Sequence, residues 1–104
     1  MAGQKTIGAT FIEPTIYYEV TGDPVPDCKG KYVFDGIFAG KKSYARIEGT
    51  FFISWYADWN DWIITDIKGS IISLVWRNQT HLITGTYSPG GEVEGEAFVT
   101  EKVV

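Results

Sequence analysis

The stretch from Phe51 to Trp62 reads F-F-I-S-W-Y-A-D-W-N-D-W and holds three of the four tryptophans in a chain of 104 residues. Its apolar residues alternate, so Phe51, Ile53 and Trp55 share one face of an extended strand. A polar turn around Asp58 separates this strand from the next. Both strands carry large apolar side chains on both faces, and such faces are normally covered. We therefore expect either two packed layers or one layer with a face that meets a partner.

The same strand-like character extends over the whole chain, because short segments rich in β-branched and aromatic residues alternate with turn formers. Strands are predicted at residues 7–12, 15–21, 31–35, 43–47, 50–56, 61–67, 71–77, 82–87 and 94–100. Tight reversals are predicted at Ala39-Gly40, Glu48-Gly49, Lys68-Gly69 and Pro89-Gly90-Gly91. No segment has apolar residues at sustained helical spacing, so helix should be nearly absent.

The predicted fold is therefore all-β, a small antiparallel meander that forms a sandwich or a partly open barrel. The length suits a single domain with one hydrophobic core. Its core is predicted from residues near the strand centres, namely Phe34, Ile53, Ile64, Trp76 and Val99.

Residues 1–29 differ in character from residues 30–104, which we expect to form the β-domain. The segment Asp23-Pro24-Val25-Pro26-Asp27 should act as a stiff spacer, because proline fixes the backbone. It would hold an extended N-terminal arm whose apolar side chains are too many to face solvent. The arm either packs on its own domain or lies on a neighbouring subunit by strand addition. The partner-binding residues predicted on it are Ile7, Phe11, Ile16 and Tyr18.

Charge and composition exclude several kinds of partner. A net charge of −4 and a pI near 4.8 argue against nucleic acid, since Lys41-Lys42 is the only basic cluster. No apolar run approaches the roughly 18 residues that span a bilayer, and no signal peptide is evident, so we expect synthesis in a cytoplasm and no membrane partner. Cys28 is the single cysteine, which is more typical of a small, half-buried residue than of a reactive thiol.

The sequence contains no catalytic signature, and we predict no enzyme activity, no cofactor, no metal and no catalytic residue. His81 is the only histidine and has no nucleophile motif around it, while Asn78-Gln79-Thr80 matches the short glycosylation pattern. One cluster could bind a ligand, because tryptophan stacks on sugar rings and polar turn residues bond to hydroxyls. It comprises Trp55, Asp58, Trp59, Asn60, Asp61 and Trp62. Its carboxylates could also serve glycoside hydrolysis or bind calcium, but ordinary turn formation explains Asp and Asn here more simply.

The order of motifs from Gly30 to Val99 carries a family resemblance. It runs G-K-Y-V-F-D-G, Y-A-R, G-T-F-F-I-S-W-Y, W-I-I-T-D, V-W-R and G-T-Y-S-P-G-G-E-V-E-G-E-A-F-V. This order resembles a small β-module that recurs in virion and adhesion proteins of phages and environmental viruses. The chain departs from the commoner form at Lys41-Lys42-Ser43 and in its apolar arm. The resemblance implies a non-enzymatic part of a virus particle and no catalytic residues.

Two functions from different classes follow as expectations. The first is a structural accessory protein of a phage particle, a capsid decoration protein located in the virion. Its arm and one aromatic face would contact other virion proteins, with the major capsid protein as the expected partner, or further copies of itself as a homo-oligomer. The second is a carbohydrate-binding module of a tail or adhesion protein, with a glycan as partner. A small hydrolase that uses Asp58 and Asp61 is disfavoured, since nothing indicates an activated nucleophile.

Overall fold

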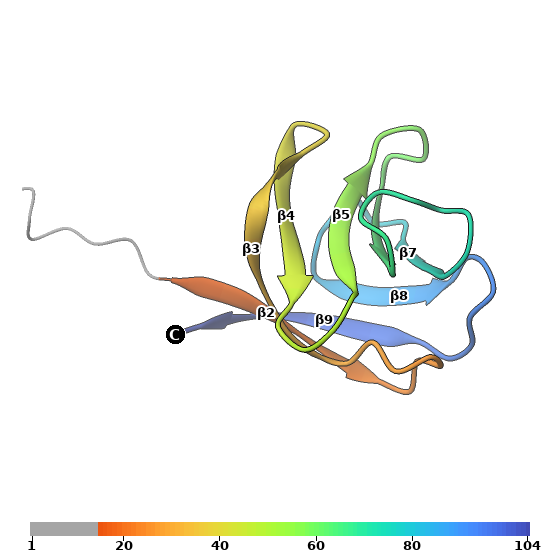
Figure 1. The fold of residues 1–104 in the computed structure, drawn as a ribbon, viewed down its shortest axis with the longest axis horizontal. Coiled ribbons are helices and arrows are strands. Elements are labelled where there is room, and N and C mark those ends of the chain that lie inside the picture. The colour runs from red at the N-terminus through yellow and green to blue at the C-terminus, as the bar shows by residue number, and fades with distance from the viewer. Residues whose placement is uncertain (1–14) are drawn as a thin grey trace, which may run out of the picture.

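The alternating segments form a closed barrel of eight antiparallel strands in a computed structural model that describes residues 15–104 (Figure 1). The strands are β2 (Ile16–Gly22), β3 (Gly30–Phe38), β4 (Lys41–Arg46), β5 (Phe52–Tyr56), β6 (Asp61–Thr65), β7 (Val75–Asn78), β8 (Gly85–Pro89) and β9 (Ala97–Val103). Each strand pairs with the next along the chain, and β2 also pairs with β9, which closes the sheet. The all-β prediction is confirmed, and the barrel is closed rather than partly open.

The strand that closes the barrel is β2, which we had placed in the N-terminal arm. All seven of its residues pair with β9, from Ile16 opposite Val103 to Gly22 opposite Ala97. Its middle residues, 18–20, also pair with β3. Residues 16–22 therefore belong to the barrel, and a domain boundary after residue 29 does not separate them from it. The other part of the expected arm, with Ile7 and Phe11, lies outside the described residues.

The expected spacer at residues 23–27 is also bound to the barrel. Val25 and Glu94 exchange two backbone hydrogen bonds of 2.8 Å each. The N–H of Asp23 donates to the carbonyl of Glu96, and the N–H of Glu96 donates to Oδ1 of Asp23, both at 3.0 Å. Arg46 donates from its guanidinium to the carbonyl oxygens of Asp27 and Lys29, both at 2.9 Å. The spacer prediction was wrong because these polar groups find partners on β4 and next to β9.

Side chains on the inward face of the strands make the core. The members that are 5% exposed or less are Tyr18, Val20, Cys28, Tyr32, Tyr44, Ile53, Ile64, Trp76, Tyr87, Ala97 and Val99. Four of the five predicted core residues are among them. Phe34 is the exception, with 54% of its surface exposed, although it lies on the same face of β3 as Tyr32.

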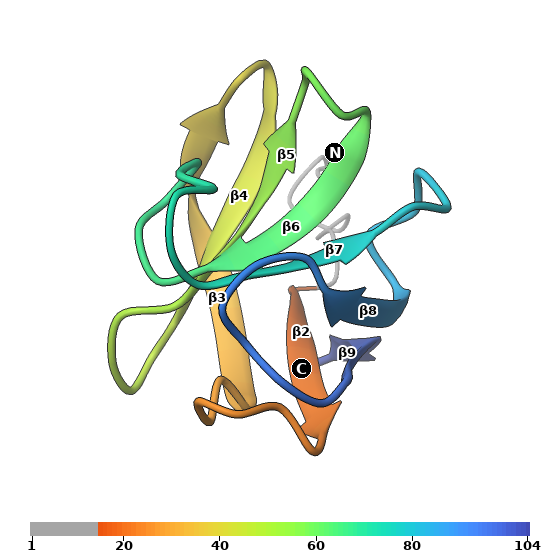
Figure 2. The same ribbon diagram turned by 90° about the vertical axis from the view of Figure 1, so that its right-hand side faces the viewer.

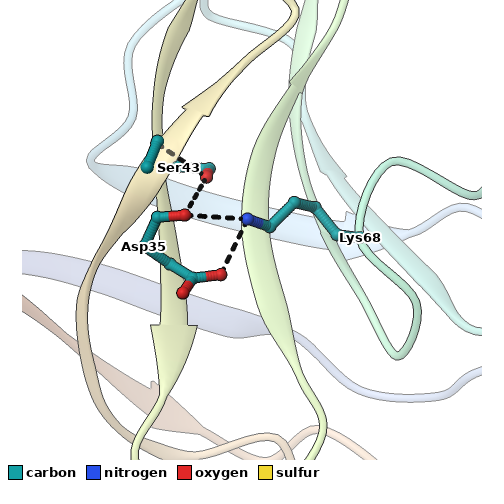
Figure 3. Close-up of polar contacts among 4 residues, drawn as sticks. Asp35, Ser43 and Lys68 are labelled. Atoms are coloured by element: carbon teal, nitrogen blue, oxygen red, sulfur yellow. Dashed lines mark hydrogen bonds and ion pairs between the residues drawn. The ribbon is translucent and has the colours of Figure 1, made fainter.

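The outward face of the central strands is covered by the long loop between β6 and β7. Lys68 in this loop reaches β3, where its Nζ lies 2.7 Å from a carboxylate oxygen of Asp35 and 3.0 Å from the Asp35 carbonyl oxygen (Figure 3). To get there the loop crosses β4 and β5, and the outward-facing Ser54 and Ile63 are fully buried. The prediction of a strand at 71–77 was therefore wrong in its first half, because residues 66–74 form this cover and β7 begins only at Val75.

Candidate functional site

The tryptophan-rich stretch does not form one site, because the sheet divides its side chains between two faces. Trp55 and Trp62 lie opposite each other on β5 and β6, with ring centroids 5.6 Å apart and edge-to-face geometry. They share the inward face with Ile53 and Ile64. Trp59, in the turn, instead packs against Tyr56. Tyr56 lies on the outward face of β5, the face of Ser54 two residues earlier. The six residues predicted as one ligand-binding cluster are thus separated.

Asp61, predicted as a solvated turn residue, is only 2% exposed. Its Oδ2 accepts from Nε of Arg77 at 2.7 Å and lies 2.6 Å from the Nη2 atom of the same guanidinium. The guanidinium also lies over the ring of Trp59, 4.2 Å from its centroid. This part of the prediction was wrong, because Asp61 holds a cross-strand ion pair and Arg77 occupies one face of the tryptophan ring.

The remaining members of the predicted cluster behave as turn residues. Asp58 and Asn60 are exposed, and Asn60 has a positive φ of 54°. The backbone N–H groups of Trp59 and Asn60 donate to the carbonyls of Tyr56 and Ala57, at 3.2 and 3.1 Å. Asparagine tolerates this left-handed conformation better than most residues. These residues therefore form the backbone reversal between β5 and β6.

A second aromatic surface is formed by inward-facing residues near the tips of the two central hairpins. We call it the aromatic platform: Phe34 from β3, Trp55 from β5 and Trp62 from β6, with Tyr44 of β4 at its base. Phe34 is 54% exposed and both tryptophans are partly exposed, whereas Tyr44 is buried. The edge of the Phe34 ring meets Tyr44 with centroids 6.3 Å apart. Sequence alternation identifies the face of these residues but not their exposure.

The platform is exposed because the opposite wall of the barrel does not extend as far. Figures 1 and 2 show the β3–β4 and β5–β6 hairpins rising beyond β8 and β9. The pairing between β2 and β3 includes Tyr18 opposite Tyr32 and does not continue towards the hairpin tip. Among the strands of residues 15–104, β3 beyond this point pairs only with β4, and the first residues of β2 pair only with β9. The inward face that is core lower in the barrel is therefore open at the tips.

The platform is continuous with the place where the chain enters the barrel. The Tyr18 ring of β2 lies edge-on to Tyr44, with centroids 4.8 Å apart. Ile16, two residues earlier on the same face of β2, packs against the core. Of the predicted partner-binding residues, Tyr18 is thus 4% exposed and structural, while Ile16 lies next to the open end.

Two lysines at the tip of the β3–β4 hairpin give the rim of the platform a positive charge. The Nζ of Lys41 lies 5.0 Å from the ring centroid of Trp55, and that of Lys42 lies 6.0 Å from that of Phe34. Ammonium groups at these distances from aromatic faces are attracted by the ring quadrupole. The platform therefore combines apolar rings with a cationic edge.

Other groups considered from the sequence are structural. Cys28 is fully buried, and burial raises the pKa of its thiol to about 12, so the nucleophilic thiolate is suppressed at neutral pH. Asn78 is fully buried, and its amide donates to the carbonyls of Leu82 and Thr84, which leaves the side chain inaccessible to glycosylation. His81 is exposed. Residues 15–104 hold no group of three or more His, Cys, Asp or Glu side chains placed to bind a metal.

Within the described barrel no helix is long and apolar enough to cross a bilayer. No family model, curated protein or solved structure matches the chain. The resemblance to a viral β-module therefore stays a prediction.

Proposed function

We propose that this protein is a non-enzymatic structural accessory protein of a phage particle, specifically a capsid decoration protein. The observation that carries the proposal is the aromatic platform, a surface made of core-facing positions that the barrel itself leaves open. Exposed apolar surfaces of this kind mark protein interaction sites. Aromatic side chains are also enriched among the residues that dominate binding energy at protein interfaces.

The chemistry of the platform describes the surface that it would bind. Phe34, Trp55 and Trp62 would pack on apolar side chains, and Lys41 and Lys42 would meet carboxylates around them. Each large ring can bury about 150 to 250 Å² on binding. At about 25 cal/mol per Å² of apolar surface, a few such rings supply a useful gain at each site. Repetition over a capsid of identical subunits would then place many copies on one particle.

The proposal is tested by sedimentation of the purified chain with phage capsids through a sucrose cushion. We expect the chain to sediment with the capsids and the variant carrying both Lys41→Glu and Lys42→Glu to remain in the supernatant, because the charge of the rim is reversed. Ile72→Asp is the matched control, since Ile72 is 86% exposed in the β6–β7 loop, away from the platform. If the chain stays in the supernatant, or if the charge reversal has no effect, the proposal is wrong.

A carbohydrate-binding module is the second candidate, because Asp58 and Asn60 are exposed beside a partly exposed Trp59. Arg77 already lies over one face of that ring, which restricts the stacking surface available to a sugar. Acrylamide quenching of tryptophan fluorescence in the presence of soluble oligosaccharides distinguishes the two functions. Protection by an oligosaccharide that is lost in Trp59→Ala would favour sugar binding over decoration.

A further inference from the structure

The edge of β3 above Tyr32 has no neighbour among the described strands. On one side β3 pairs with β4 through Val33, Phe34 and, after a bulge, Ile37 and Phe38. On the other side its pairing with β2 covers only Gly30, Lys31 and Tyr32. Unpaired strand edges of this kind accept a further strand. Here the edge borders the aromatic platform.

The backbone groups of this edge point away from β4. Ile47 donates its N–H to the carbonyl of Lys31, so Lys31 and, two residues on, Val33 direct their backbone groups towards β4. The intervening residues of an antiparallel strand direct theirs to the other side. Phe34 therefore presents its N–H and C=O at the open edge and its ring on the adjoining platform.

We propose that residues 7–12 of a second copy of this chain add to the β3 edge and that two copies exchange these segments reciprocally. The segment from Thr6 to Ile12 reads T-I-G-A-T-F-I and carries no charge. As a strand it would place Ile7, Ala9 and Phe11 on one face, which matches the apolar platform, and Gly8, Thr10 and Ile12 on the other. Self-association goes beyond the proposed function, since it requires no capsid. Because both contacts use the platform, the exchanged segment and a capsid would compete for it.

The position where the described chain begins favours binding of the segment to the β3 edge of a second copy rather than to the β3 edge of its own barrel. The carbonyl of Thr15 accepts from the N–H of Val104 at 2.9 Å, which fixes the outer end of the β2–β9 ribbon. Only Glu13 and Pro14 separate the segment from this point. A two-residue hairpin turn needs a positive φ, whereas proline fixes φ near −65° and keeps the preceding residue extended. Residues 7–14 can extend about 26 Å from Thr15, which is enough to reach the adjoining face of a second barrel packed beside the first.

The test is analytical ultracentrifugation of the full chain and of two full-length variants. We expect the parent chain to be a dimer at micromolar concentration. Phe11→Asp and Phe34→Asp should each raise the dissociation constant on the order of 100-fold, because a buried ring is replaced by a charge. An equimolar mixture of the two variants should recover a dimer in part, since one of its two reciprocal contacts is intact, namely the segment of the Phe34→Asp chain on the platform of the Phe11→Asp chain.

Controls keep the result specific. Ile72→Asp should remain dimeric, and far-UV circular dichroism must match the parent for every variant; Phe34→Ser replaces Phe34→Asp if the latter is misfolded. A monomeric parent chain overturns the inference. The inference is also overturned if Phe11→Asp remains a dimer with the parent's affinity. It is overturned too if the mixture of the two folded variants stays monomeric. Capsid sedimentation is scored separately, so a failure of self-association leaves the proposed function standing.

Discussion

The hydroxyl of Tyr32 donates a 2.6 Å hydrogen bond to the carbonyl oxygen of Cys28, four residues earlier in the chain. Tyr87 makes the same 2.6 Å bond to Ile83, also four residues earlier. Both tyrosines are fully buried. A glycine with a positive φ lies two residues before each of them, so two segments of unrelated sequence use the same device. The device pins the chain where it enters β3 and β8.

Tyr32→Phe and Tyr87→Phe should each lower the free energy of unfolding by about 1 to 3 kcal/mol, because the carbonyl of Cys28 or of Ile83 loses the tyrosine hydroxyl that donates to it. Urea denaturation measures the change. Tyr17→Phe is the control, since Tyr17 is only partly buried, and it should change the value by less than about 0.5 kcal/mol. Equal changes in the free energy of unfolding in all three variants would show that the two hydrogen bonds do not stabilise the fold.

Stability should fall steeply in alkali. Burial raises the pKa of Cys28 to about 12 and raises the pKa values of Tyr18, Tyr32, Tyr44 and Tyr87 above the ordinary value of 10.0. The unfolded chain releases these protons at its lower pKa values, while the folded protein retains them. Their contribution is thus complete below about pH 9 and is lost progressively above it.

Absorbance at 295 nm and circular dichroism, followed together from pH 8 to 13, test this expectation. The four buried tyrosines should ionise in the same transition in which the β-signal is lost. Ionisation of all the tyrosines while the fold remains intact would contradict it. A thiol reagent at pH 8 should likewise label Cys28 only after urea is added.

The ion pair between Asp61 and Arg77 should stabilise the β5–β6 turn. Asp61→Asn should lower the free energy of unfolding by about 1 to 3 kcal/mol, a value reduced from that of a fully buried pair because Arg77 is partly exposed. Asp58→Asn changes the same type of side chain at an exposed position of the turn and should have an effect below about 0.5 kcal/mol. Thermal denaturation compares the two. A larger effect at Asp58 would overturn the assignment.

Trp76 is fully buried, and its indole N–H donates to the carbonyl of Gly95 at 3.2 Å. Trp76→Ala should cost about 3 to 5 kcal/mol, the usual loss for a large ring removed from a core. Phe34→Ala should cost less than about 1 kcal/mol, because the ring is largely exposed in the isolated barrel. Denaturation is measured at a concentration where the chain is monomeric, so that lost association does not contribute.

Alternation in the sequence predicted most of the strands at residues 15–104, with shifted ends for the last three, and the face on which their central side chains lie. Ile53, Ile64, Trp76 and Val99 are buried as expected, because residues near strand centres lie within the closed part of the barrel. Phe34 has the same local pattern. Its exposure depends on where β2 turns away from β3, which is set by a pairing between distant segments. Local periodicity therefore identifies a face but not the extent of the opposite wall.

The candidate site was predicted only in part for a similar reason. Trp55 and Trp62, both in the predicted ligand-binding cluster, lie opposite each other in the structure, since register across a hairpin follows from its turn. The burial of Asp61 depends on Arg77, sixteen residues later and on another strand. The role of Lys41 and Lys42 beside the platform likewise depends on how the hairpin tips lie in space. Such contacts between separate hairpins leave no periodic signal.

The long ladder between β2 and β9 joins the two ends of the barrel sequence. Thr15 and Val104 are hydrogen-bonded neighbours, and a short linker could connect them. The chain could then be opened at the exposed Gly90-Gly91 turn to give a circular permutant with the same strand order around the barrel. In that permutant the β2–β9 pairing would become a local hairpin, and the pairing between β8 and β9 would provide the distant closure instead. Because distant closure slows folding, the permutant would show whether joining the two chain ends limits the folding rate of this barrel.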